Sequence, residues 1–171
     1  MKILVNKNFK LKNFQNKNDE FYKLNDKLII FGTVFSFCGQ KINLSSIIKK
    51  LKKTILDSPI EKVQNLLDGR FVIIREKKNI LEIFTDKNGR YDLYYSDLKK
   101  YMIISNKIEK YFFENRIKKN YQYFDQFALA SMLVNYGTYA PKQNTMYKNV
   151  RKLGTYEYIL YNKKSETLPT K

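Results

Sequence analysis

The sequence contains no histidine and only one cysteine, Cys38. Histidine is the commonest metal ligand and the commonest general base near neutral pH, so zinc sites, Ser/His/Asp triads and Cys/His pairs are all excluded. A lone cysteine also cannot form an internal disulfide. We therefore expect no metal, no cofactor and no disulfide framework, and we interpret Cys38 as a buried structural residue.

Long hydrophobic runs are missing as well. The opening stretch MKILVNKNFK holds too short an apolar run for a signal peptide. No segment approaches the roughly 20 consecutive apolar residues that a membrane helix needs. We therefore expect a cytoplasmic protein that does not span a membrane.

Acidic residues are few relative to basic ones, with 16 Asp and Glu against 33 Lys and Arg and a net charge of +17. Such an excess can mark a surface that binds nucleic acid. The lysines, however, come in pairs spread over nearly the whole chain, beside abundant Asn and Ile. An A/T-rich genome produces the same bias, so nucleic acid is the less favoured partner.

The sequence does contain enough apolar material for a packed core. Hydrophobic residues make up 43% and aromatic residues 15%, which is more than a disordered, charge-dominated chain carries. A chain of 171 residues fits one ordinary domain. We expect a single domain over residues 1–171, with its core between about residue 27 and residue 162.

The first half of the chain predicts one strand and two helices. Residues 27–37, KLIIFGTVFSF, are too apolar for an exposed strand and predict a strand buried on both faces. A β-bulge or a close approach by another group would explain Gly32 in its middle. Residues 43–56 place apolar side chains at helical spacing opposite lysines, which predicts an amphipathic helix on a sheet.

The second predicted helix has start and stop signals of its own. Ser58 is the expected N-cap, Pro59 the first helical residue, Glu61 the partner in a capping box, and Gly69 the stop.

Strand-like runs dominate the rest of the chain. The first four are separated by connections so short that successive strands must be antiparallel, which predicts a β-meander. A third helix is expected over residues 124–137, with Val134 among its buried residues, before a last strand over residues 154–162. The order of elements predicts an α+β protein whose sheet is mainly antiparallel. The four meander runs are residues 70–76, 79–86, 91–96 and 101–105.

The stretch LLDGRFVIIREKKNILEIFTDKNGRYDLYY resembles a passage in asparagine synthetase and related class II glutamine amidotransferases. In that family a Leu/Gly/Phe strand start leads to a hairpin, then to an acid, a glycine and paired tyrosines. Residues 101–112 and 124–160 agree with the family in order and spacing, and residues 28–37 would be the earlier strand that carries the Asn-Gly pair in active members. The matching positions are Leu67, Gly69, Phe71, Asp86, Gly89, Leu93, Tyr94 and Tyr95.

The resemblance implies a four-layer αββα sandwich of two mainly antiparallel sheets, of the N-terminal-nucleophile hydrolase type. It also implies a vestigial substrate-binding region at Gly32, Asp86 and Gly89. Two roles stay open for Asp86, which could stabilise the turn or bind a ligand.

The chemistry of active family members is missing from the matching positions. Their nucleophile is a cysteine at residue one whose own amine is the base, whereas Met1 here is followed by Lys2 and the initiator methionine is not expected to be removed. In the Asn-Gly pair that holds the oxyanion, Gly32 is preceded by Phe31, which has no side-chain donor. Active family members have an acid near the first helix that binds the α-amine of glutamine. This chain has lysines there, and Asp57 comes only after the helix. We therefore expect no catalytic residues and no glutaminase activity.

The resulting hypothesis is an asparagine synthetase-like glutamine amidotransferase domain that does not hydrolyse glutamine. It would be a structural or docking partner of an ATP-dependent amide-forming ligase, in cis or in trans, and a homodimer is also open. Two alternatives stay open. One is a basic nucleic-acid-binding module in which lysines flank strand tyrosines, and the other is an enzyme of unknown chemistry built on Asp86, Asp92 and Arg90. The strand tyrosines are Tyr91, Tyr94, Tyr95 and Tyr101.

Overall fold

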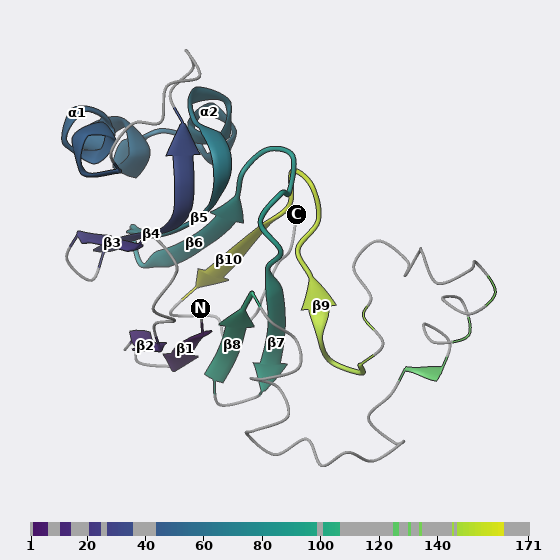
Figure 1. Ribbon diagram of the computed structural model, residues 1–171. Coiled ribbons are helices and arrows are strands. Elements are labelled where there is room, and N and C mark those ends of the chain that lie inside the picture. Colours follow the sequence, from purple (N-terminus) through teal and green to yellow (C-terminus); the bar gives the residue numbers. More distant parts are fainter. Residues whose placement is uncertain are drawn as a thin grey trace. The chain divides into compact units, whose positions relative to one another are not determined.

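The structure is a computed structural model (Figure 1). It divides into two compact units, one made of Met1–Gln15 with Asp92–Gly154 and the other of Asn16–Tyr91 with Thr155–Lys171. The prediction of a single domain over residues 1–171 stays a prediction. The described residues are 2–6, 11–14, 21–24, 27–35, 44–98, 101–106, 125, 126, 130, 134, 145 and 147–162.

The second unit contains a five-stranded antiparallel sheet in the order β10-β6-β5-β4-β3. Its strands are β3 (Phe21–Leu24), β4 (Leu28–Phe35), β5 (Asp68–Lys77), β6 (Ile80–Thr85) and β10 (Tyr158–Asn162). Strands β5 and β6 are joined by a two-residue turn in which both residues have positive φ, 48° at Lys78 and 67° at Asn79. Such turns match the right-handed twist of hairpin strands. The predicted strands within residues 27–37, 70–76, 79–86 and 154–162 are thereby confirmed.

Two helices lie on one face of this sheet (Figure 1), α1 (Leu44–Asp57) and α2 (Ile60–Leu66). The amphipathic helix predicted over residues 43–56 is therefore confirmed as α1. The predicted cap of the second helix is wrong, because Pro59 is the N-cap of α2 and no side chain caps it. Gly69 is not a helix stop either, since Leu67 is the C-cap in an extended conformation and Gly69 already belongs to β5.

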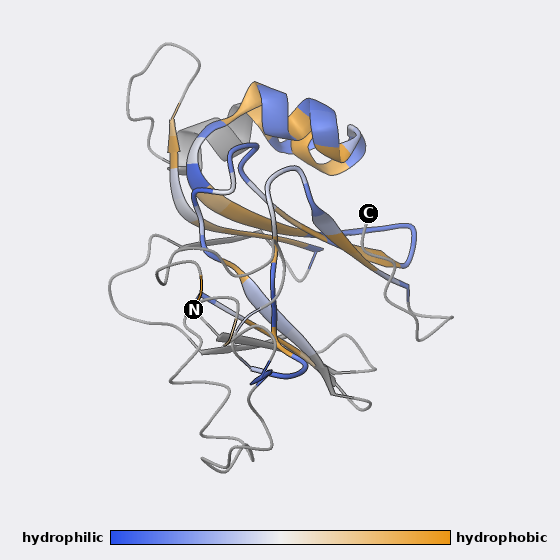
Figure 2. Ribbon diagram, turned by 90° about the vertical axis from the view of Figure 1, so that its right-hand side faces the viewer, coloured by the Kyte–Doolittle hydropathy of each residue, from blue (hydrophilic) through white to orange (hydrophobic). Residues whose placement is uncertain are grey.

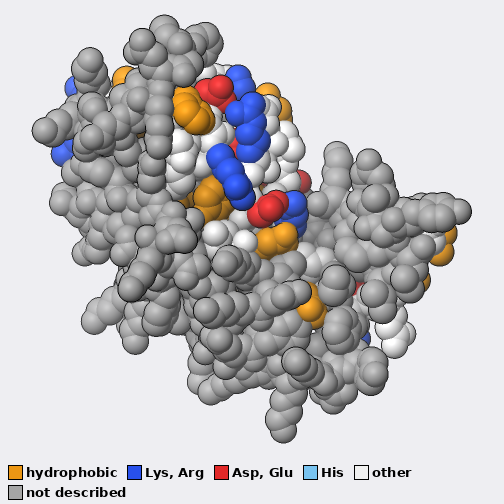
Figure 3. Space-filling view, viewed as in Figure 1, with side chains coloured by type: hydrophobic (Ala, Val, Ile, Leu, Met, Phe, Trp, Pro, Cys, Tyr) orange, Lys and Arg blue, Asp and Glu red, His pale blue; other side chains and the backbone are white. Residues whose placement is uncertain are grey.

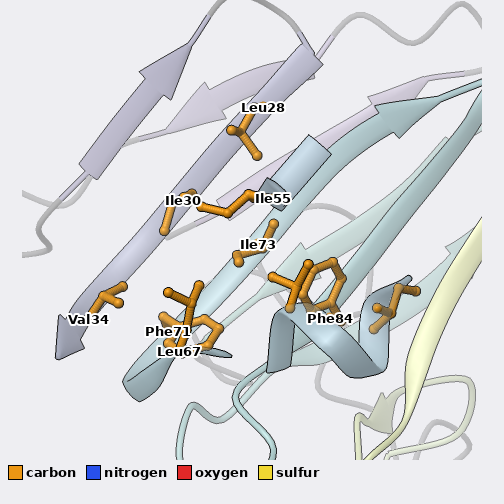
Figure 4. Close-up of a cluster of buried hydrophobic side chains, with 10 residues drawn as sticks. Leu28, Ile30, Val34, Ile55, Leu67, Phe71, Ile73 and Phe84 are labelled. Carbon is orange, nitrogen blue, oxygen red and sulfur yellow. The ribbon is translucent and has the colours of Figure 1, made fainter. Parts of the chain in front are cut away.

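Both faces of the central strands of this sheet are apolar and buried. The face toward the helices forms one hydrophobic cluster (Figure 4), and hydrophobic residues run along the strands in Figure 2. On the opposite face, Ile29, Ile74, Ile83 and Ile159 form one row across four strands, and all are buried. The prediction that β4 is buried on both faces is confirmed. The helix-side cluster consists of Leu28, Ile30, Val34, Ile55, Ile60, Val63, Leu67, Phe71, Ile73 and Phe84.

A buried arginine lies within the helix-side core. Arg75 on β5 is 1% exposed, and its guanidinium donates to the Ile55 carbonyl oxygen of α1 and to Glu82 Oε2, with Nε 2.5 Å from that oxygen. Two residues on, Lys77 Nζ donates to the Asp57 carbonyl oxygen at 2.6 Å. The last turn of α1 contains no basic residue. Strand β5 thus supplies the cations that favour a helix C-terminus.

The first unit contains a second five-stranded antiparallel sheet, in the order β2-β1-β8-β7-β9. Its strands are β1 (Lys2–Asn6), β2 (Leu11–Phe14), β7 (Tyr94–Leu98), β8 (Tyr101–Ser105) and β9 (Arg151–Lys152).

The predicted meander is wrong at its middle connection. Strands β5 and β6 pair, and so do β7 and β8, but β6 and β7 belong to different sheets. The reason is competition for edges, because a strand has only two hydrogen-bonding edges. Those of β6 are taken by β5 and β10, and those of β7 by β8 and β9. Residues 86–93 therefore form a connection between sheets and not a hairpin.

Most of the third predicted helix, over residues 124–137, lies outside the described residues. Its described members Gln126, Ala130 and Val134 are helical. The predicted burial of Val134 is wrong, because this side chain is 77% exposed.

The protein is thus α+β with mostly sheet content, as predicted at that level. Within the described part of the chain, no helix is long and apolar enough to cross a membrane.

Candidate functional site

The connection after β6 is organised around the buried carboxylate of Asp86. Its side chain is 1% exposed and accepts three backbone N–H bonds. Asn88 N and Arg90 N donate to Oδ1 at 3.1 and 3.2 Å, and Tyr91 N donates to Oδ2 at 3.2 Å. Gly89 N donates to the Asp86 carbonyl oxygen at 2.9 Å, with Gly89 in the left-handed region at φ +61°. The carboxylate therefore fixes the path of five consecutive turn residues.

Two of the predicted site positions lie on opposite sides of one strand residue. Gly32 of β4 is the cross-strand partner of Phe71 in β5. From the β6 side, Asp86 N donates to the Phe71 carbonyl oxygen at 3.2 Å. Gly89 lies three residues further along the same turn and packs on Thr155, which precedes β10. The structure thus brings Gly32, Asp86 and Gly89 to the same end of one sheet.

Gly32 and Gly69 allow a close approach between the backbones of β4 and β5. Their φ angles are +96° and +131°. A Cβ atom on Gly32 would lie 2.1 Å from the Arg70 carbonyl oxygen, and one on Gly69 would lie 2.2 Å from the Thr33 carbonyl oxygen. The expected close approach at Gly32 is confirmed, and no side chain other than hydrogen fits at either position.

The neighbour of Gly32 offers no polar group. Phe31 is a buried ring, one residue along the strand from the helix-facing Ile30, and its cross-strand partner Val72 is also apolar. A hydrocarbon ring cannot donate a hydrogen bond to an oxyanion. Of the other positions considered, Lys2 lies in β1 and Asp57 is the last residue of α1, while Cys38 lies outside the described residues.

Sequence reasoning missed a set of charged and aromatic contacts between the start of β5 and the end of the turn. Arg90 Nη1 lies 3.1 Å from Asp68 Oδ1, and the Arg70 guanidinium lies 5.6 Å from the centroid of the Tyr91 ring. Asp68 and Arg70 are two residues apart in β5, so strand alternation places them on the same face. Strand alternation alone could have placed Asp68 and Arg70 on one face. It could not have shown that the turn carrying Arg90 and Tyr91 contacts that face.

A second missed residue is Gln64 of α2. Its side chain is buried, and Nε2 donates to the Thr85 carbonyl oxygen at 2.8 Å, one residue before Asp86. Nothing in the local pattern distinguishes this polar residue from a solvent-facing one.

In the first unit, three side chains gather at the β7–β9 pair. Lys152 Nζ lies 2.6 Å from Asp92 Oδ1 and 6.0 Å from the centroid of the Tyr94 ring. Burial, and after it the Asp92 carboxylate, raise the pKa of the Tyr94 hydroxyl, while Lys152 lowers it. The hydrogen bond to Asp92 raises the pKa of the Lys152 ammonium.

The side chains named for the two alternative functions have separate side-chain contacts in the described structure. The Asp86 carboxylate accepts from turn backbone, including Arg90 N, whereas the Asp92 side chain binds Lys152 and the Arg90 side chain binds Asp68. Of the tyrosines, Tyr91 and Tyr95 are buried and not open for base stacking. The side chain of Tyr101 lies outside the described residues.

Charge in the described part is mixed. Figure 3 shows basic and acidic side chains together on the same face. Among the described residues, no group of His, Cys, Asp and Glu could hold a metal ion.

No protein-family model matches the chain, and no curated protein is similar enough to it to count as a match.

Proposed function

We propose that this chain is a degenerate, asparagine synthetase-like glutamine amidotransferase domain without glutaminase activity. In this proposal it is a structural or docking partner of an ATP-dependent amide-forming ligase, supplied in cis or in trans. The observation that carries the proposal is the connection fixed by Asp86. The stretch with the family resemblance passes from one five-stranded antiparallel sheet to another at this connection, as a two-sheet sandwich requires.

We propose further that the two sheets form the inner layers of an αββα sandwich. Helices α1 and α2 cover one face of the β10-β6-β5-β4-β3 sheet. The opposite face presents the apolar row of Ile29, Ile74, Ile83 and Ile159, all buried. Buried apolar surface on both faces of an antiparallel sheet is typical of an inner layer. Experimental coordinates showing this row covered by something other than the second sheet would overturn the four-layer arrangement.

The loss of glutaminase activity follows from the residues at the matching positions. Gly32 and Gly89 supply only backbone, Phe31 replaces an amide donor, and the Asp86 carboxylate already accepts three backbone bonds. Removing one oxyanion donor typically lowers the rate by about 100-fold or more. Cys38 has no histidine anywhere in the chain to activate its thiol. Asp86 as a ligand-binding residue stays a prediction.

Ammonia release from glutamine is the direct test. The purified chain and its Cys38→Ser variant are incubated with glutamine, and ammonia is followed with a coupled glutamate dehydrogenase assay. We expect both proteins to match the buffer blank. Release by the unaltered chain that Cys38→Ser abolishes would overturn the claim of inactivity.

The partner is tested by affinity capture of the full chain from its native source under crosslinking conditions. The proposal requires an ATP-dependent amide-forming ligase among the captured proteins, and a change in that ligase's stability or product formation when the pure chain is added. Recovery of nucleic acid alone, with binding that weakens steeply as salt rises, would support the nucleic-acid-binding alternative instead.

A further inference from the structure

The turn held by Asp86 contains the only Asn-Gly pair in the sequence, Asn88 followed by Gly89. The asparagine of this pair is exposed to solvent. An asparagine that precedes glycine is chemically prone to deamidation, because glycine has no side chain to hinder attack by its backbone nitrogen on the asparagine amide. The sequence therefore makes Asn88 reactive, and the geometry of the turn decides how fast it reacts.

The reaction joins two groups that are neighbours in the chain. The Gly89 nitrogen forms a bond to the side-chain carbonyl carbon of Asn88. The bond from that carbon to Nδ2 breaks, and the proton lost by the Gly89 nitrogen leaves with Nδ2 as ammonia. Water then opens the five-membered imide at either of its two carbonyl groups, which gives aspartate or isoaspartate at position 88. Water is the only co-reactant, so the rate depends on local geometry.

The observed turn keeps the Gly89 nitrogen away from this path. Gly89 N donates to the Asp86 carbonyl oxygen at 2.9 Å, which closes a β-turn with Lys87 and Asn88 as its central residues. The amide at the other end of the asparagine is also fixed, because Asn88 N donates to Asp86 Oδ1 at 3.1 Å. Ring closure requires the peptide group between Asn88 and Gly89 to rotate until its nitrogen faces the asparagine side chain. This rotation breaks the hydrogen bond from Gly89 to Asp86.

The Asp86 carboxylate opposes this rotation from both sides of the reactive pair. Its Oδ1 accepts from Asn88 N and also from Arg90 N, at 3.2 Å, so one oxygen holds the backbone before and after the peptide group that must rotate. Asp86 is 1% exposed, which limits the access of water to these bonds. Breaking one hydrogen bond to a charged acceptor shifts an opening equilibrium by about tenfold or more.

We propose that Asn88 is a latent deamidation site, which Asp86 protects as a positioning residue and which reacts when the turn opens. The inference is independent of the proposed function, because the ammonia comes once from the chain itself and not from glutamine. Isoaspartate makes the change permanent. It inserts one more carbon into the backbone between residue 88 and Gly89, so the bond from Gly89 N to the Asp86 carbonyl oxygen cannot re-form in the same register.

The first test compares the full chain with an acetylated, amidated peptide of residues 84–92. Each is incubated in H₂¹⁸O at mildly alkaline pH, and entry of ¹⁸O at Asn88 is followed by proteolysis and mass spectrometry. The peptide lacks the buried surroundings of the turn, so it should react at least about tenfold faster than the folded chain. The chain unfolded in urea should react at the rate of the peptide. Equal rates in the peptide and the folded chain overturn the inference.

An internal control is present in the same samples. Asn79 is exposed in the turn between β5 and β6, but the β-branched Ile80 follows it and hinders attack by the backbone nitrogen. It should stay unmodified in the folded chain while Asn88 reacts. Modification of Asn79 as fast as Asn88 overturns the inference, because it would show that exposure alone sets the rate.

Two variants separate local opening of the turn from global unfolding. Asp86→Ala should raise the rate at Asn88 by about tenfold or more, because it removes the charged acceptor. Ile55→Ala is the matched control, since it removes a buried side chain of the helix-side cluster without touching the turn. It should leave the rate within about twofold of the unaltered chain, because local opening does not require global unfolding. Equal acceleration in both variants overturns the inference.

Hydrogen exchange in the unaltered chain gives a result that does not depend on whether Asp86→Ala folds. The Gly89 N–H can exchange only when its bond to the Asp86 carbonyl oxygen is broken. We expect the factor by which its exchange is slowed to match the factor by which deamidation is slowed relative to the peptide. Unprotected exchange at Gly89 overturns the inference.

Discussion

Replacing Asp86 by alanine removes the acceptor on which the connection between the two sheets depends. Three backbone N–H groups lose their partner, those of Asn88, Arg90 and Tyr91. The Tyr91 bond is buried, whereas the other two are partly accessible to water. The perturbation therefore tests whether the carboxylate or the surrounding packing holds the turn.

The expected magnitude follows from the burial of each donor. A hydrogen bond to a charged acceptor contributes about 1.5–3 kcal/mol, and loss of one that water can replace costs about 1 kcal/mol or less. The buried Tyr91 N–H contributes about 2 kcal/mol and the two accessible donors together about 1–2 kcal/mol on this scale. We expect Asp86→Ala to lower the free energy of unfolding by about 3–4 kcal/mol, or the melting temperature by about 10 °C for a chain of this length.

Urea denaturation followed by circular dichroism measures this loss. In Asp86→Asn one side-chain oxygen can still accept from Asn88 N and Arg90 N, but the side-chain NH₂ group would face the Tyr91 N–H, and two donors cannot bond to each other. This variant should therefore lower the free energy of unfolding by about 2 kcal/mol. Asp57→Ala is the control, because that residue is exposed at the end of α1, and it should change stability by about 0.5 kcal/mol or less. A loss below about 1 kcal/mol for Asp86→Ala would refute the reasoning, since it would show that water replaces the carboxylate.

The remaining predictions concern backbone space and pH. Gly32→Ala should lower the free energy of unfolding by more than about 3 kcal/mol, because the new Cβ would lie 2.1 Å from a backbone oxygen. Gly89→Ala should lower it by only about 1–2 kcal/mol, because the nearest contact there is 3.3 Å. Similar losses for the two variants in urea denaturation would contradict this difference. The raised pKa values of Tyr94 and Lys152 mean that the folded state holds these protons more tightly than the unfolded state, where they leave near pH 10.0 and 10.5. The contribution of these two protonated groups to stability is complete below pH 10 and is lost as the pH rises further. Asp92→Asn removes a cause of both pKa shifts, so it should reduce the fall in the free energy of unfolding between pH 9 and pH 11. An unchanged fall would refute the coupling.

The sequence by itself determined the features that depend on local pattern. The apolar runs and the amphipathic spacing predicted six elements close to their observed positions, namely β4, β5, β6, β8, β10 and α1. The need for a close approach at Gly32 was also readable, because glycine inside a buried strand usually marks a bulge or a point where another backbone comes near. Local periodicity reports which side chains are buried, and these elements are defined by burial.

Only the tertiary structure decided which strands are neighbours and what the polar residues contact. The meander failed because the pairing of β6 with β10, 70 or more residues apart in the sequence, takes the edge that β7 would have used. The contacts of Arg75 with α1 and of Gln64 with the end of β6 likewise join segments about 20 residues apart. Segments far apart in the sequence compete for the same strand edges and the same buried hydrogen-bond partners. A local sequence pattern does not show which of these segments will pair.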